Sequence, residues 1–299
     1  MMLRMLGRLA AVALLLLLAT SLQAAEGKFF DSDGVKIHYV EQGQGEPVVL
    51  IHGFSANHAL NWVAPGIVGK LSKKFRVVAI DNRGHGKSDK PQDPKQYGTQ
   101  MVQDVVRLLD HLQIPKAHIV GYSMGGFITN KFLSEHPDRV ITATLGGAGW
   151  SQDGDQGEPV MEALAESLEQ GKGIAPLILA LNPPGKPQPT ENELNLINQM
   201  VMANNDPLAL ASAIRGMKQL QISQEKIEAN EVPTLALIGE VDPLKAGVDA
   251  LQEVMPNLEV VVIEGADHMT AISNPLFVNS LNEFLLNHSR QPAAAVGGN

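Results

Sequence analysis

The chain has 299 residues and a mass of 32.1 kDa, with 44% hydrophobic and 18% charged residues. This balance excludes a disordered, collagen-like or coiled-coil chain, and it supplies enough apolar material for the core of one large domain. The formal charge of −9 argues against nucleic acid as a partner, and the absence of cysteine excludes disulfides, thiol nucleophiles and Cys-ligated metal sites.

Residues 1–25 have the pattern of a secretory signal peptide. Arg4 and Arg8 form a positive segment, the apolar run Leu9–Ala19 follows, and the sequence is then small and polar up to Glu26. The apolar run is too short for a stable transmembrane span. We therefore expect a secreted or periplasmic protein, with an uncleaved interfacial anchor as the alternative for this segment.

Beyond the leader, short apolar runs typical of strands alternate with helical patterns. The predicted strands are Val35–Val40, Val48–Ile51, Val77–Ile80, His118–Tyr122, Val140–Leu145, Thr234–Ile238 and Leu258–Ile263. The predicted helices are Met101–Leu112, Ser123–Glu135, Val248–Val254 and Pro275–Leu286. This order predicts an α/β fold with a mostly parallel sheet covered by helices on both faces, and with the first strand at an antiparallel edge.

The alternation of strands and helices stops between residues 149 and 230. Only helical patterns occur there, at Pro159–Gln170, Glu191–Ala203 and Leu208–Leu220, with a proline cluster between Pro183 and Pro189. Because strand patterns resume at Thr234, we interpret 149–230 as an acidic helical cap inserted into a core of residues 26–148 and 231–290. The Ala/Gly-rich tail 291–299 is predicted to be disordered.

The segment Gly121-Tyr122-Ser123-Met124-Gly125 lies between a predicted strand and a predicted helix. In a nucleophile elbow, the residues two before and two after the serine are small because the turn is too tight for larger side chains. Such a turn would present the Ser123 hydroxyl, and the Met124 amide at the helix N-terminus would stabilise an oxyanion. The alternative is a glycine-rich turn with a capping serine.

A serine nucleophile needs a base, and the base needs an acid to orient it. His268 follows the last predicted strand and Asp242 follows the strand before it, so both are expected at the carboxyl edge of the sheet with Ser123. Glu240, in the same loop as Asp242, is the second choice for the acid. Asp267 adjoins His268 too closely in sequence to orient its ring.

The segment His52-Gly53-Phe54 follows a predicted strand and is expected to supply the second oxyanion amide, that of Phe54, with His52 bracing the loop. Residues 81–88, which include Arg83, lack P-loop spacing, and we interpret them as an internally bonded turn with Arg83 as its strut. No HExxH motif or paired His/carboxylate cluster is evident, so no metal and no cofactor are expected.

Trp150, Met161 and Met269 are candidates for the substrate pocket, together with Phe54 and Met124. Methionine side chains adapt to irregular apolar groups, which would suit an acyl pocket. Each of these residues is equally compatible with ordinary core packing.

These motifs together resemble those of α/β-hydrolases, and the resemblance extends from Lys28 to Asn287. It implies the α/β-hydrolase fold, a Ser123 nucleophile, a His268 base, an Asp242 acid, and Phe54 and Met124 as oxyanion donors. Serine rather than aspartate at the elbow argues against dehalogenase-like and epoxide-hydrolase-like members. The sequence is most similar to carboxylesterases and to their relatives, the carbon–carbon bond hydrolases and cofactor-free perhydrolases.

The resemblance implies an exported serine esterase that cleaves a small-molecule carboxylic ester through an acyl-enzyme. Two alternatives stay open. The same triad could cleave another bond, as a carbon–carbon hydrolase, amidase or perhydrolase, or the chain could be a non-catalytic ligand-binding member of the fold.

Overall fold

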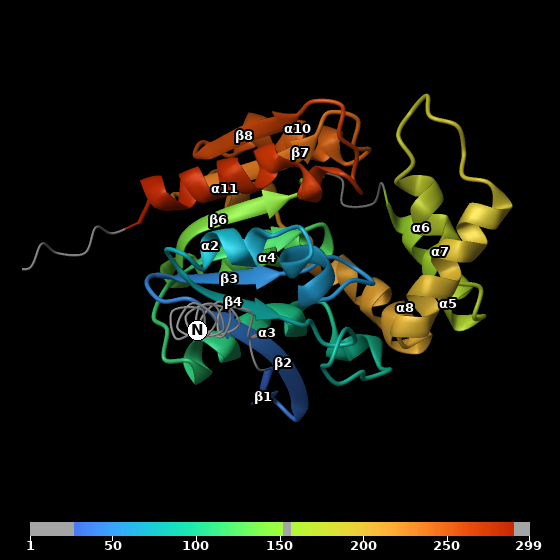
Figure 1. The fold of residues 1–299 in the computed structure, drawn as a ribbon, viewed down its shortest axis with the longest axis horizontal. Coiled ribbons are helices and arrows are strands. Elements are labelled where there is room, and N and C mark those ends of the chain that lie inside the picture. Colours follow the sequence, from blue (N-terminus) through green and yellow to red (C-terminus); the bar gives the residue numbers. More distant parts are fainter. Residues whose placement is uncertain (1–26, 152–156, 290–299) are drawn as a thin grey trace, which may run out of the picture.

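The computed structural model describes residues 27–151 and 157–289 (Figure 1). The predicted signal peptide and the predicted disordered tail lie outside these residues. In the part of the chain that is described, no helix combines the length and the apolar character needed to cross a membrane.

An eight-stranded sheet in the order β1-β2-β4-β3-β5-β6-β7-β8 forms the centre of the molecule (Figure 1). Its strands are β1 (Lys28–Ser32), β2 (Val35–Gln42), β3 (Pro47–Ile51), β4 (Arg76–Ile80), β5 (Ala117–Tyr122), β6 (Val140–Gly146), β7 (Thr234–Gly239) and β8 (Leu258–Ile263). β2 pairs antiparallel with β1 and β4, and all other neighbours are parallel. The predicted α/β class and the mostly parallel sheet are confirmed. The sheet also has an antiparallel end, but β1 lies at its edge, and the predicted first strand, β2, is the second strand of the sheet.

All seven predicted strands are present, and the sequence analysis missed only β1. The apolar residues of β1, Phe29 and Phe30, are adjacent rather than alternating, so the segment carries no strand signal of its own. Its conformation comes from pairing with β2 across the tight turn between Ser32 and Val35.

Helices cover both faces of the sheet. They are α2 (Ile67–Leu71), α3 (Thr99–His111), α4 (Met124–Glu135), α10 (Lys245–Val254) and α11 (Pro275–Asn287), with short turns η1 (Ala59–Val63), η2 (Pro94–Gln96), η3 (Pro137–Arg139) and η5 (Ala271–Ser273). The helices α3, α4 and α10 pack on one face, where Val49 and Ile51 of β3 point. The helices α2 and α11 pack on the other face with Val48 and Leu50. Successive residues of β3 therefore serve two cores, as a strand buried on both faces must.

Within its described part, the segment between β6 and β7 consists of helices and connecting loops and contains no strand. It contains α5 (Glu158–Glu169), α6 (Ala175–Ala180), α7 (Glu191–Asn204), α8 (Pro207–Gly216), η4 (Met217–Leu220) and α9 (Gln224–Glu228). The helices α5 and α8 share a small core that includes Leu164, Leu168, Leu210 and Ile214. The arrowheads of β3 and β6 point toward this helical group, which lies beyond the carboxyl edge of the sheet (Figure 1). Its role as a separate cap stays a prediction.

Candidate active site

Ser123 occupies the turn that joins β5 to α4. Its φ of 53° and ψ of −118° are rare for a residue with a side chain, and its amide donates a hydrogen bond to the Gly146 carbonyl at 2.7 Å. A Cβ at position 121 would collide with the Gly125 carbonyl, and one at position 125 would collide with the Ile51 carbonyl. The two glycines are therefore required by the close approach of backbone on either side of Ser123.

The side chains of Ser123, His268 and Asp242 form a continuous hydrogen-bonded line. His268 Nε2 lies 3.0 Å from Ser123 Oγ, and His268 Nδ1 lies 2.8 Å from Asp242 Oδ2. Because an ionised carboxylate can only accept, Nδ1 carries the ring proton and the lone pair of Nε2 faces the serine hydroxyl. This arrangement can remove a proton from Ser123.

Burial and backbone contacts hold the two partners of Ser123 in place. His268 and Asp242 are only 4% and 3% exposed. Asp242 Oδ1 accepts a hydrogen bond from the Leu244 amide at 2.9 Å, which leaves Oδ2 directed at the imidazole of His268. Both residues sit in loops that follow neighbouring parallel strands, β7 and β8, so the sheet brings them to one edge.

Tyr122 contacts His268, and the sequence analysis did not identify it as a site residue. Its hydroxyl donates a hydrogen bond to the His268 carbonyl, and the two rings lie 5.5 Å apart. Burial raises the pKa of the Tyr122 phenol well above its usual range, so the hydroxyl keeps its proton. Its position next to Ser123 in the sequence could have marked Tyr122 as a site residue. Only the fold shows that its hydroxyl reaches the loop after β8.

The amides of Phe54 and Met124 are the candidate oxyanion donors. Neither amide donates a hydrogen bond to any residue within 27–151 and 157–289. The Gly53 amide is already used, since it donates to Asn61 Oδ1 at 2.7 Å. A Cβ at position 53 would lie 3.2 Å from Ser123 Cβ, so glycine lets this loop approach the serine closely.

The carboxylates that compete with Asp242 are bonded elsewhere. Glu240 accepts the Gly265 amide at 2.9 Å, and Asp267 pairs with Lys186 at 2.8 Å. Burial favours the protonated form of Asp267, but hydrogen bonds from Lys186 and Thr270 outweigh it and lower the pKa of this carboxyl to about 2. Neither carboxylate bonds to the His268 ring.

The pocket candidates fall into different environments. Trp150 is 9% exposed, belongs to the main core, and donates its indole N–H to the Ile222 carbonyl at 2.9 Å. Met161 and Phe54 are partly buried against the small core of α5 and α8, and Phe54 also contacts the main core. Met124 is buried, whereas Met269 is 65% exposed beside His268.

This chain is similar in sequence and in fold to several known proteins. A family profile described as "alpha/beta hydrolase fold" matches residues 46–176. A pimeloyl-[acyl-carrier protein] methyl ester esterase of Aliivibrio fischeri is 28% identical over 85% of this chain and 98% of its own length. The structure of a thermophilic esterase from Thermogutta terrifontis superposes with a TM-score of 0.71 at 24% identity, covering 89% of this chain and all of the esterase. The chain belongs to the α/β-hydrolase superfamily.

A further relative of this α/β-hydrolase is the 3-oxoadipate enol-lactonase 1 of Acinetobacter baylyi. It is 27% identical over 70% of the chain and 77% of its own length. The esterase of Aliivibrio fischeri and the lactonase of Acinetobacter baylyi are both hydrolases by name, so the chain is counted among the hydrolases of the superfamily.

The expectation that this α/β-hydrolase has no paired His/carboxylate cluster is wrong. His38 on β2 and His58 before η1 each place Nδ1 2.8 Å from a different oxygen of Asp81, which follows β4. Sequence reasoning missed the cluster because its members are 20 to 43 residues apart and carry no motif spacing. The fold joins them by pairing β2 with β4.

The four acceptor positions of Asp81 are already used by N–H donors. Besides the two imidazoles, the amides of His58 and Lys87 donate to it at 2.9 and 3.0 Å. Burial favours the protonated acid, but the hydrogen bonds from His38 and His58 outweigh it and hold the pKa of Asp81 well below its usual range. The cluster is therefore a hydrogen-bonded hub that anchors the loop after β4.

The same loop contains Arg83, whose predicted role as a strut agrees with the structure. Its guanidinium forms two hydrogen bonds to Asp104 of α3, at 2.7 and 2.6 Å, and one to the Gln96 carbonyl at 2.6 Å. His52 braces the neighbouring loop, since its Nε2 accepts the Asn82 amide at 3.0 Å.

Proposed function

We propose that this α/β-hydrolase is a serine hydrolase that cleaves carboxylic esters of small molecules. The observation that carries the proposal is the line Ser123–His268–Asp242, with the ring lone pair directed at the serine hydroxyl. Ester cleavage is favoured over other bond types because the relatives from Aliivibrio fischeri and Acinetobacter baylyi are named as a methyl ester esterase and a lactonase, and a lactone is a cyclic ester.

In the proposed first half-reaction, His268 Nε2 takes the Ser123 proton while Oγ bonds to the ester carbonyl carbon. The carbonyl oxygen becomes an oxyanion, which accepts hydrogen bonds from the Phe54 and Met124 amides, each such donor contributing about 3 kcal/mol. The C–O bond to the alcohol then breaks, and the alcohol leaves with the proton from His268.

In the second half-reaction, His268 takes a proton from water as the water oxygen attacks the acyl-enzyme. The same amides stabilise the second oxyanion. The bond to Ser123 Oγ breaks, Oγ regains a proton from His268, and the carboxylic acid is released. Asp242 keeps the imidazole in the required tautomer in both halves.

The proposal includes a role for residues 149–230 in substrate choice. Phe54 packs against the small core of α5 and α8, and Asn205 at the end of α7 donates to the Ser55 carbonyl at 3.2 Å, so this segment touches the oxyanion loop. Met161→Phe should change the order of preference among acyl chains. Trp150→Phe is the contrasting variant, because Trp150 lies in the core and its replacement should lower stability instead.

Export also belongs to the proposal and rests on the leader pattern of residues 1–25 alone. Expression of the whole chain followed by fractionation tests it. A mature protein in the periplasm or medium, with an N-terminus near residue 26, supports export, and retention of the uncut chain in the cytoplasm contradicts it.

The nucleophile and bond class are tested together on a panel of p-nitrophenyl esters of increasing acyl length. Wild type should turn over the shorter esters, and a fluorophosphonate probe should label Ser123. Ser123→Ala should lose both ester turnover and labelling by the probe. Ser273→Ala, at an exposed serine, should keep both. Labelling of another serine would contradict the nucleophile assignment. Faster turnover of matched amides or carbon–carbon substrates would contradict ester cleavage.

A further inference from the structure

The loop after β3 that carries the Phe54 amide is a tight turn with a strained residue. The Ala56 amide donates a hydrogen bond to the Gly53 carbonyl at 3.4 Å, which closes the turn 53–56. Ser55, the third residue of this turn, has a φ of 55°. A positive φ is unfavourable for a residue with a side chain, and glycine usually occupies such a position. We therefore expect contacts from outside the turn to hold Ser55 in this conformation.

The direction of the Phe54 amide depends on this turn. In a planar trans peptide, the N–H of one residue points away from the carbonyl of the residue before it. The Gly53 carbonyl accepts hydrogen bonds from the Ala56 amide and from His52 Nδ1, the latter at 2.7 Å. Because these donors fix the direction of the Gly53 carbonyl, they also fix the direction of the Phe54 N–H. A change in the turn would therefore misdirect this oxyanion donor.

Asn205, in the helical segment 149–230, contacts the turn. It directly follows α7, and its side-chain amide donates to the Ser55 carbonyl at 3.2 Å and to the Val201 carbonyl of α7 at 3.0 Å. An amide nitrogen of a side chain carries two hydrogens, so one bonds to the end of the helix and the other to the turn. The bond to Ser55 therefore holds the carbonyl of the strained residue from a position 150 residues away in the chain.

The start of α8 holds Asn205 in place. Asp206, the next residue, accepts two amides of the first turn of α8, each at 2.9 Å, and so caps this helix. Ser212 of α8 donates to the Gln92 carbonyl at 2.7 Å, which ties the helix to the loop before η2. The donor to Ser55 is therefore attached to the core through α8.

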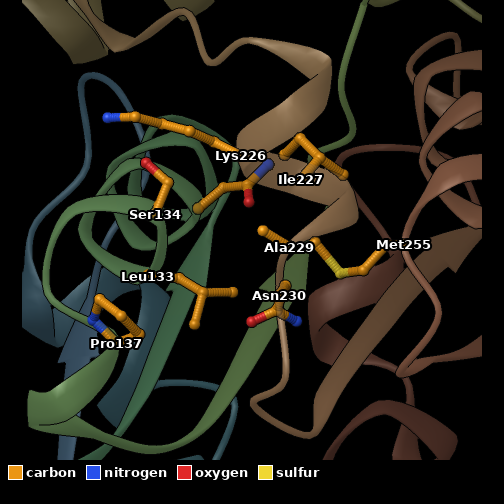
Figure 2. Close-up of a pocket in the computed structure, with 9 residues that line it drawn as sticks. Leu133, Ser134, Pro137, Lys226, Ile227, Ala229, Asn230 and Met255 are labelled. Carbon is orange, nitrogen blue, oxygen red and sulfur yellow. The ribbon is translucent and has the colours of Figure 1, made fainter.

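The far end of the helical segment makes a different contact. α9, the last helix before β7, and α4 line a cavity of about 140 Å³, to which they contribute Ile227 and Leu133 (Figure 2). No residue that lines this cavity belongs to the candidate active site or to the turn 53–56. The hydrogen bond to the turn thus comes from the junction of α7 and α8 and not from α9.

We propose that Asn205 is a positioning residue of the oxyanion site. Its hydrogen bond keeps Ser55 in the strained conformation that the turn requires, and the turn directs the Phe54 N–H at the developing oxyanion. The helical segment thus contributes to the rate of the reaction and not only to the choice of substrate. This inference rests on the proposed function for the reaction, but its structural part can be measured without any ester.

The test compares Asn205→Ala with Asn204→Ala. Asn204, exposed at the end of α7, donates to the Met200 carbonyl at 2.8 Å, so its replacement removes the same kind of bond at the helix end. On the preferred p-nitrophenyl ester, Asn205→Ala should lower kcat about tenfold, less than the roughly 10²- to 10³-fold for complete loss of an oxyanion donor. KM should stay within about twofold, because the oxyanion forms only after binding. Asn204→Ala should keep the wild-type kcat.

Ser55→Gly tests whether backbone strain is the reason for the effect. Glycine adopts a positive φ without a steric penalty, so the turn should no longer depend on Asn205. In the Ser55→Gly background, Asn205→Ala should therefore lower kcat by less than about twofold. An equal loss of kcat in both backgrounds would contradict the role given to Ser55.

Two further measurements do not depend on ester cleavage. In protein labelled with ¹⁵N-phenylalanine, the Phe54 amide signal, assigned from Phe54→Leu, should shift in Asn205→Ala and stay in place in Asn204→Ala. Labelling of Ser123 by a fluorophosphonate should slow about tenfold in Asn205→Ala, because the phosphoryl oxygen occupies the same oxyanion site. If wild type is labelled but cleaves no ester, the proposed function fails, and these two measurements still decide the role of Asn205.

Three results would overturn the proposal. A wild-type kcat and an unmoved Phe54 signal in Asn205→Ala would show that the turn does not need this hydrogen bond. A raised KM with an unchanged kcat would make Asn205 a contact for substrate binding. An equal loss of kcat in Asn204→Ala would assign the effect to the end of α7, and thermal unfolding of both variants would show the accompanying loss of stability.

Discussion

Two assemblies in this protein pair a buried aspartate with histidine Nδ1, and they have different consequences. Asp242 and Asp81 both follow strands of the sheet, and both accept imidazole N–H groups at 2.8 Å. In the first assembly the far nitrogen of His268 faces the Ser123 hydroxyl at 3.0 Å. In the second, the far nitrogen of His38 is buried without a hydrogen-bond partner among the described residues.

The comparison shows that an Asp–His pair is not by itself a catalytic device. The pair can activate a group only where the second imidazole nitrogen meets a nucleophile, as at Ser123. Around Asp81 the same interaction holds β2, η1 and the loop after β4 together. We therefore expect variants of Asp242 to change activity and variants of Asp81 to change stability.

The largest effect is expected for Asp242→Asn. The amide can donate to His268 Nδ1 and favour the wrong tautomer, so kcat on the preferred ester should fall about 10⁴-fold, as in other serine triads. The melting temperature should change little. Steady-state kinetics and thermal unfolding on the same preparation measure both, and a variant that keeps a tenth of wild-type kcat would contradict the role of Asp242.

Asp81→Asn is the matched variant in the assembly of Asp81, His38 and His58. It should lower stability strongly and change kcat little, the opposite of Asp242→Asn. Its amide nitrogen would face an N–H donor, so the free energy of unfolding should fall by about 3 kcal/mol, the scale for disrupting a buried charged network. Urea unfolding measures the loss, and active-site titration corrects kcat for the folded fraction. A corrected kcat reduced as strongly as in Asp242→Asn would erase the distinction between the assemblies.

The loop anchored by Asp81 should also make stability sensitive to acid through His85. Burial lowers the pKa of His85 to about 3, so between pH 6.5 and 3 the unfolded chain binds a proton that the folded chain does not. Stability should therefore fall by up to about 1.4 kcal/mol per pH unit in this range from His85 alone. In His85→Phe the slope of unfolding free energy against pH should be shallower by that amount. An unchanged slope would contradict the lowered pKa.

The smallest effect is expected at Asp267, which adjoins His268 without contacting its ring. Lys186→Met removes its half-exposed partner, so stability above pH 4 should change by less than about 0.5 kcal/mol. The pKa of Asp267 should rise from about 2 toward its ordinary value, which NMR titration of the carboxyl carbon would follow. The pH dependence of kcat/KM should match that of wild type, and a displaced profile would link Asp267 to the base.

The sequence by itself predicted most of the sheet and the order of the candidate site residues. Strands buried on both faces are short apolar runs, and each of the seven predicted runs is a strand of the sheet. Gly121 and Gly125 could be interpreted locally because a tight strand-to-helix turn limits side-chain size whatever surrounds it. Ser123, Asp242 and His268 could be proposed together because each follows a strand, and parallel strands end at one edge.

Tertiary structure decided what depends on contacts between distant segments. The edge strand β1 forms by pairing with β2, and Tyr122 supports His268 across 146 positions of the chain. The choice between Asp242 and Glu240 rests on which carboxylate faces the imidazole, because both lie in one loop. His38, His58 and Asp81 carry no shared spacing, so only the fold brings them together. Local patterns encode burial and turns, whereas hydrogen-bond partners and cavities depend on how separate elements meet in the folded chain.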